Sequence, residues 1–248
     1  AVAAVIALGG GLLLAPMASA QTVLSGAQTT TRTLTGTPLV VETDDTFSVV
    51  TTTTGGSALV LNGTNGTSVT DSNASTITGA IGGIDARNSG TGALSVTSTG
   101  AVSGTTFEGI NASNSITGNS LTIAAAAVTG AAQGIYARNS GTGTLSVTTT
   151  GAVTGTGGSG IGAIGKGLTI SAAAVSGNLN GIFAKGNGGA LSVTTTGAVT
   201  GTSSIGIRAY SYGTNMTVSA AAVSGGFEGI SADNRGTGAL SVTSTGAV

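Results

Sequence analysis

Three short sequence phrases recur in a fixed order along the chain, at a period of about 24 residues. The first is Gly-Ile-x-Ala, the second is an apolar-polar-apolar triplet, and the third closes with a valine. Successive closing valines are 22 to 26 residues apart, so the length varies slightly while the order does not. Such a period is typical of a solenoid, in which each repeat contacts only its neighbours and loops absorb insertions.

Each phrase occurs seven times. Gly-Ile-x-Ala begins at Gly83, Gly109, Gly134, Gly160, Gly181, Gly206 and Gly229. The triplets are centred on Ser95, Thr122, Ser146, Thr169, Ser192, Thr217 and Ser241. The closing valines are Val102, Val128, Val153, Val175, Val199, Val223 and Val248.

The phrases have the pattern of short β-strands. Each alternates apolar and polar residues, is rich in Val, Ile and Thr, and is bounded by Gly, Asn and Ser. A helical repeat is excluded by 45 glycines among 248 residues, since each glycine costs a helix roughly 1 kcal/mol relative to alanine. The fold class is therefore predicted to be all-β.

Three strands per period could form either a meander of hairpins or one coil of a parallel β-helix. We favour the coil, because stacking each residue on its equivalent explains a near-identical repeat, whereas hairpins would alternate partners. The Ile and Ala of the first phrase would then point inward, as would the two apolar residues of the triplet and the closing valine. A turn is predicted just past the first strand, where Asn and Gly tolerate left-handed backbone. This position is occupied by Asn88, Asn114, Asn139, Gly165, Gly186 and Asn234.

Three segments are expected along the chain. Residues 1–20 are apolar and end in Ala18-Ser19-Ala20, which is typical of a secretory signal peptide; a transmembrane helix is the alternative, but the apolar run before Pro16 is shorter than the ~20 residues that span a bilayer. Residues 21–39 are a polar leader or an N-terminal cap. Residues 40–248 form the β-helix repeat domain, about nine coils that end without a capping segment, so we expect it to be incomplete at its C-terminus.

Composition excludes several kinds of chemistry. The net charge is −1 and charged residues make up 6% of the chain, so there is no basic footprint for nucleic acid. The chain has no Cys and no His, which removes disulfides, thiol nucleophiles, imidazole bases and Cys/His metal sites. The eight acidic residues are expected to scatter over the coils, with Glu108 and Glu228 at one corner but about 24 Å apart. We therefore expect no catalysis, no cofactor and no metal in this region.

Coils such as GIYARNSGTGTLSVTTTGAVTGT (134–156), together with the signal-like N-terminus and the absence of Cys, resemble the passenger domains of bacterial autotransporters, which use type V secretion. The resemblance implies a right-handed β-helix, carried to the cell surface or released by a C-terminal outer-membrane β-barrel. That translocator is an implied partner and is not seen in this chain. A structural stalk with an adhesion or aggregation role is the expected function; the alternative is the stalk of an enzyme whose catalytic domain lies elsewhere.

The two x positions of Gly-Ile-x-Ala-x face outward and concentrate cationic and aromatic residues. Such a mixture is enriched at recognition surfaces, so we expect a strip that contacts a ligand on a host or neighbouring cell. A different interpretation is that long side chains merely shield the sheet. The strip consists of Tyr136, Arg138, Phe183, Lys185, Arg208 and Tyr210.

A second outward surface is expected on the strand formed by the triplet, where the central Ser or Thr of each of the seven triplets forms a ladder of hydroxyls. The neighbouring outward row consists of Thr97, Ala124, Thr148, Ser171, Thr194, Ser219 and Thr243. This array resembles the flat face of ice-binding β-solenoids, which gives a third functional alternative.

Overall fold

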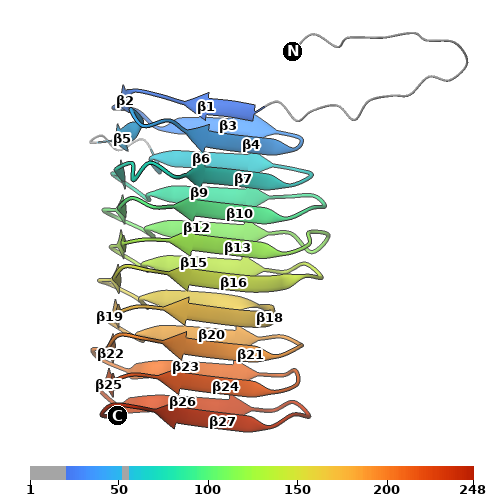
Figure 1. The fold of residues 1–248 in the computed structure, drawn as a ribbon, viewed down its shortest axis with the longest axis vertical. Coiled ribbons are helices and arrows are strands. Elements are labelled where there is room, and N and C mark those ends of the chain that lie inside the picture. The colour runs from blue at the N-terminus through green and yellow to red at the C-terminus, as the bar shows by residue number, and fades with distance from the viewer. Residues whose placement is uncertain (1–20, 52–55) are drawn as a thin grey trace, which may run out of the picture.

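The computed structural model describes residues 21–51 and 56–248, which form a parallel β-solenoid of about nine turns, with roughly 25 residues per turn. The described part of the chain contains 27 strands and no helix, and hence no helix long and apolar enough to cross a membrane. Figure 1 shows the coils stacked along one axis in chain order, from β1 at one end to β27 at the other. Residues 1–20, predicted to be a signal peptide, lie outside the described residues.

Each coil contributes one strand to each of three parallel sheets, which we call sheets A, B and C. Sheet A consists of β1 (Gln21–Leu24), β4 (Leu39–Thr43), β7 (Thr67–Asp71), β10 (Leu94–Ser98), β13 (Leu121–Ala125), β16 (Thr144–Thr149), the second half of β18 (Ile161–Ala172), β21 (Leu191–Thr195), β24 (Met216–Ala220) and β27 (Leu240–Ser244). Sheet B consists of β2 (Ala27–Gln28), β5 (Ser48–Val50), β8 (Ile77–Gly79), β11 (Val102–Gly104), β14 (Val128–Gly130), β17 (Val153–Gly155), β19 (Val175–Gly177), β22 (Val199–Gly201) and β25 (Val223–Gly225). Sheet C consists of β3 (Arg32–Gly36), β6 (Leu59–Gly63), β9 (Ile84–Asn88), β12 (Ile110–Asn114), β15 (Ile135–Asn139), the first half of β18, β20 (Ile182–Gly186), β23 (Ile205–Ser211) and β26 (Glu228–Asn234).

Equivalent residues of successive coils pair in register, which confirms the coil and excludes the hairpin meander. In sheet C, Ile110 lies between Ile84 and Ile135. In sheet B, Val128 lies between Val102 and Val153. Every strand pairing in the described chain is parallel, so each inward side chain packs against its own counterpart above and below.

The three predicted inward stripes form one continuous core. Their members are almost completely buried through the middle of the rod, including Ile135 of sheet C, Leu145 of sheet A and Val153 of sheet B. Burial falls off in the last coil, where Leu240 is 46% exposed, because β27 pairs only with β24. Core burial therefore depends on stacking between coils, and a single coil encloses no core.

The predicted start of the repeat domain at about residue 40 is wrong, because strands of the solenoid already occur in residues 21–39. Strands β1, β2 and β3 pair in parallel with β4, β5 and β6, respectively. The segment escaped alignment with the later repeats because its inward positions are weakly apolar: in β3 only Leu34 packs partly against the core. The segment covers the next coil as a cap would, but it does so by forming a coil itself.

The predicted left-handed turn residues are also wrong in position. None of the asparagines just past the first strand has a positive φ; the left-handed positions lie two to four residues further on, at Gly92, Gly167 and Gly189. Asn88, Asn114 and Asn139 instead point into the core and are 1–2% exposed. Asn88 Nδ2 donates to Asn114 Oδ1 at 2.8 Å, and Asn114 Nδ2 donates to Asn139 Oδ1 at 3.1 Å, so the three side chains form an internal amide ladder.

A buried carboxylate lies at the end of β7. Asp71 is fully buried, and it accepts hydrogen bonds from Thr43 Oγ1 and Ser98 Oγ, both at 2.9 Å, on the coils to either side. Burial acts to raise the pKa of Asp71, but the hydrogen bonds from Ser75, Ser98 and Thr43 outweigh it and lower the pKa. Ser75 contributes its backbone N–H, which donates to Asp71 Oδ1 at 3.3 Å, whereas Ser75 Oγ is buried and makes no hydrogen bond within the described residues.

Replacing Asp71 with asparagine is expected to lower the free energy of unfolding by about 1–3 kcal/mol at neutral pH, because the charge-assisted hydrogen bonds are lost. Since the folded state holds the pKa below the unfolded value of about 3.9, this stabilisation is present above pH ~4 and is lost as the pH falls below it. Thermal unfolding of the wild type and of Asp71→Asn between neutral pH and pH ~2.5 measures this pH dependence. The difference in Tm between the two proteins is expected to narrow below pH ~4. A difference that widens in acid would contradict the assignment.

Candidate recognition surface

The six residues of the predicted strip all lie on the outer side of sheet C, where two outward positions in each strand alternate with the buried Ile and Ala. β15 carries Tyr136 and Arg138, β20 carries Phe183 and Lys185, and β23 carries Arg208 and Tyr210. Phe183 is in register with Arg208, and Lys185 with Tyr210. The six residues therefore share one face of the solenoid, although they do not form one cluster.

Four of the six predicted residues come together at a shallow hollow of about 300 Å³. Two residues outside the predicted strip, Tyr212 and Arg235, complete its lining. We call this site the cationic–aromatic hollow; it is lined by Phe183, Lys185, Arg208, Tyr210, Tyr212 and Arg235.

Aromatic rings hold the cations of the hollow in place. Arg208 Nε donates to Tyr210 Oη at 2.7 Å, and the guanidinium carbon lies 5.0 Å from the centre of the same ring. Lys185 Nζ lies 5.7 Å from the centre of the Tyr212 ring. Phe183 and Tyr210 make an edge-to-face contact with ring centres 6.4 Å apart. Cation–π contacts of this kind are each worth about 0.5–1 kcal/mol near a surface, so the side chains are arranged before any ligand arrives.

The hollow carries a positive charge. Lys185, Arg208 and Arg235 contribute three cations, and Asp233 is the carboxylate that pairs with one of them, through Arg235 Nε at 2.7 Å. The hydrogen bond that Arg235 Nε donates to Asp233, together with the charge of that carboxylate, raises the pKa of Arg235 above its usual value. Two cationic charges remain without a carboxylate partner inside the hollow.

Tyr136 and Arg138 lie apart from this hollow. Strand β18 separates them from β20 and places Gly162 and Ile164 at the equivalent outward positions. The Tyr136 ring leans over Gly162, where an added Cβ would lie 3.5 Å from Tyr136 Cδ2. Arg138 is exposed and has no hydrogen bond or ion pair within the described residues.

The two missed residues could have been found by extending the outward alternation by one more position. Ser211 pairs with Asn234 at the inward position, so the next residues of the two coils, Tyr212 and Arg235, face outward together. Both residues lie beyond the second x of Gly-Ile-x-Ala-x, so that phrase alone does not predict them.

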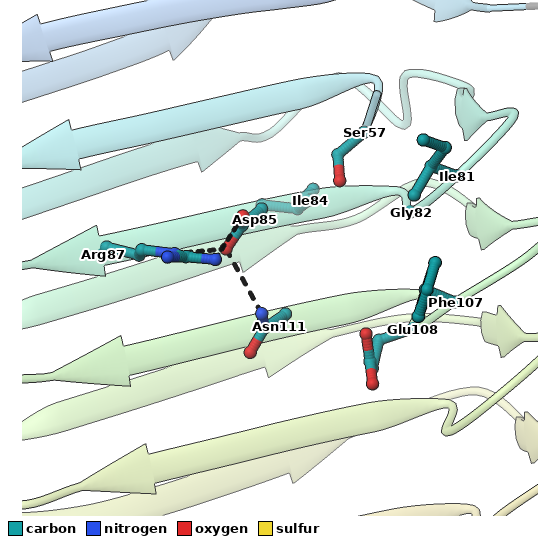
Figure 2. Close-up of a pocket in the computed structure, with 9 residues that line it drawn as sticks. All are labelled: Ser57, Ile81, Gly82, Ile84, Asp85, Arg87, Phe107, Glu108 and Asn111. Carbon is teal, nitrogen blue, oxygen red and sulfur yellow. Dashed lines mark hydrogen bonds and ion pairs between the residues drawn. The ribbon is translucent and has the colours of Figure 1, made fainter. Parts of the chain in front are cut away.

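A second hollow of about 220 Å³ lies on sheet C nearer the N-terminal end (Figure 2). Arg87 pairs with Asp85 at 3.0 Å, and Asn111 Nδ2 donates to Asp85 at 3.3 Å. Glu108, which belongs to the next coil, lines the same hollow. Figure 2 shows the Asp85 carboxylate turned toward Arg87 and Asn111, while Glu108 lies apart from it beside Phe107.

The predicted hydroxyl ladder lies on the outer side of sheet A. The row through Ser95, Thr122 and Ser146 continues in register along the strands to Ser241, with a hydroxyl on every coil. The neighbouring row is interrupted at Ala124, which pairs with Thr97 and Thr148. No group of three acidic side chains that could hold a metal ion occurs in residues 21–51 and 56–248.

Comparison with known proteins adds no family to this geometry: no family model, no curated protein and no solved structure matches the chain.

Proposed function

We propose that this chain is the rigid, surface-displayed solenoid of an autotransporter-like secreted protein, and that it binds a ligand on another cell through the cationic–aromatic hollow. In this proposal a C-terminal outer-membrane β-barrel delivers the chain to the cell surface, and the solenoid has no catalytic role. The N-terminal sequence resembling a signal peptide and the Cys-free coils support the secretion route.

One observation carries the recognition role: three cations and three aromatic rings, from three successive coils, line one hollow on an otherwise weakly charged rod. The contacts among Lys185, Arg208, Tyr210 and Tyr212 hold the side chains in position, so little conformational entropy remains to be lost on binding. Shielding of a sheet requires no such clustering. Recognition therefore explains the arrangement better than protection of the surface does.

Adhesion of cells that display the chain tests this function. The full chain is fused to an outer-membrane β-barrel on a laboratory bacterium, and attachment to epithelial cells and settling of the bacteria are measured. Replacing Lys185, Arg208, Tyr210 and Arg235 with serine is expected to reduce attachment or settling about tenfold or more, since a few central Arg and Tyr residues carry most of the binding energy of an interface and about 1.4 kcal/mol is a factor of ten.

The matched control replaces Tyr136 and Arg138 with serine, because these residues are of the same types and lie on the same sheet outside the hollow. That control is expected to behave as wild type. Equal attachment by wild type and the fourfold variant, at equal surface display, would rule out the hollow as the adhesive site.

A further inference from the structure

We propose that the cationic–aromatic hollow binds an acidic polysaccharide, with the carboxylates of different uronic acid units held by cations on successive coils. This inference rests on the proposed function, because it names the ligand class of the same site.

The three cations lie on three consecutive coils, at three different positions along the strands: Lys185 is in register with Tyr210 and Asp233, Arg208 precedes that row by two residues and Arg235 follows it by two. Lys185 is on β20, Arg208 is on β23, and Arg235 follows β26, so they lie on three consecutive coils. Parallel strands are spaced about 4.8 Å apart, which puts the outer two coils about 10 Å apart. The cations are also offset along the strands, by about 13 Å between Arg208 and Arg235, so they surround Tyr210 and do not form a row along the rod axis. An acidic saccharide that crosses the sheet obliquely over Tyr210 can therefore bring carboxylates of different uronate units to different cations.

Both arginines keep their outer nitrogens available. Arg208 is held through Nε by Tyr210 Oη, and Arg235 is held through Nε by Asp233. Within the described residues neither guanidinium makes a hydrogen bond through its Nη groups. A guanidinium fixed at Nε and open at its outer nitrogens suits a carboxylate, which accepts parallel N–H donors in bidentate geometry.

The ring arrangement favours a sugar over single-stranded nucleic acid. A base stacks on an open ring face, but Arg208 lies over the Tyr210 ring and Lys185 lies over the Tyr212 ring. The rings leave edges and phenolic hydroxyls, which can contact sugar C–H groups and donate to sugar oxygens. A net charge of −1 for the whole chain also gives a long phosphate backbone little to bind beyond the hollow.

Calorimetric titration of the full chain tests the proposal, with a galacturonate hexasaccharide as the acidic probe and its fully methyl-esterified form as the neutral control. The hexasaccharide is expected to bind, to bind more weakly as salt is raised, and to lose all detectable affinity when esterified. Arg208→Gln and Arg235→Gln are each expected to weaken binding about tenfold or more, as the loss of a charge-assisted hydrogen bond implies. Arg138→Gln, a matched exposed cation on the same sheet, is expected to bind within about twofold of wild type.

The side chains that are changed point outward, so each variant should keep the wild-type circular dichroism spectrum and Tm, which separates loss of binding from loss of fold. Equal affinity for the acidic and esterified probes, tighter binding of a single-stranded oligonucleotide of equal charge, or no binding of the hexasaccharide at millimolar concentration would each overturn the proposal. If the hexasaccharide fails while adhesion still depends on the hollow, the ligand class is wrong and the proposed function stands. If adhesion is also independent of the hollow, both fail.

Discussion

Replacing Gly130 with alanine is expected to lower the free energy of unfolding by about 3 kcal/mol, which corresponds to a decrease in Tm of about 6–12 °C for a chain of this size. Gly130 ends β14, and a Cβ there would overlap the Gln133 carbonyl oxygen and lie 2.7 Å from the Gly109 backbone nitrogen. Both groups are backbone atoms, so no side chain can move aside to relieve the contact. Urea denaturation and thermal unfolding of the full chain measure the loss.

The control for this prediction is Thr129→Ala, in the same strand but exposed on the outer side of sheet B. It is expected to change the free energy of unfolding by less than about 0.5 kcal/mol. A Gly130→Ala protein as stable as the control would mean that the corner between sheets B and C can open without cost. The same glycine ends the sheet B strand of other coils, as at Gly104 and Gly155, so the result applies to the repeat as a whole.

The period predicted the solenoid correctly because the three inward stripes are a direct consequence of stacking. Ile110, Leu121 and Val128 of one coil are each buried against the same positions of the next coil. Alternation within each phrase was enough to assign these side chains to the core, since successive residues of a strand point to opposite faces. For the seven clear repeats from Gly83 onward, the sequence was therefore enough to predict the three strands of each coil, their order and their register.

The polar interior could not be predicted from the same pattern. Asparagine after a strand is a common turn residue, and the local sequence gives no sign that Asn114 points inward. What decides its orientation is the partner on the coils above and below, since Asn88 and Asn139 supply the hydrogen bonds that a buried amide needs. Asp71 is a similar case, because its hydroxyl partners come from the neighbouring coils.

The candidate site was predicted in part for a related reason. Outward alternation identified Phe183, Lys185, Arg208 and Tyr210, but the alternation alone gave no measure of which coils were close enough to share a ligand. Gly162 and Ile164 of β18 break the strip between β15 and β20. Proximity across coils, and not the number of cationic or aromatic residues, defines the hollow.

Replacing Asn114 with alanine is expected to destabilise the chain by about 3 kcal/mol, because this residue makes most of the polar contacts at its corner. Asn114 Oδ1 accepts from Asn88, while Asn114 Nδ2 donates to Asn139 Oδ1 and to the carbonyls of Asn119 and Ser120, all three at 3.1 Å. Truncation therefore breaks the amide ladder in the middle and releases the loop between β12 and β13. Thermal unfolding gives the magnitude, and hydrogen exchange of residues 115–120 should show a local loss of protection.

Two further variants separate the ladder from other roles of asparagine at this corner. Asn111→Ala removes the same side chain from the outer side of the same strand, where it makes one hydrogen bond at 3.3 Å, and is expected to cost under about 1 kcal/mol. Asn114→Ser should be less destabilising than Asn114→Ala, because a serine already occupies the equivalent position of β23. That residue, Ser211, is buried, and its Oγ accepts a hydrogen bond from the Gly213 backbone N–H at 3.2 Å. If Asn114→Ala and Asn111→Ala lowered the free energy of unfolding by the same small amount, the hydrogen bonds of the buried amides would contribute nothing to stability. Backbone pairing and apolar packing alone would then hold the coils together.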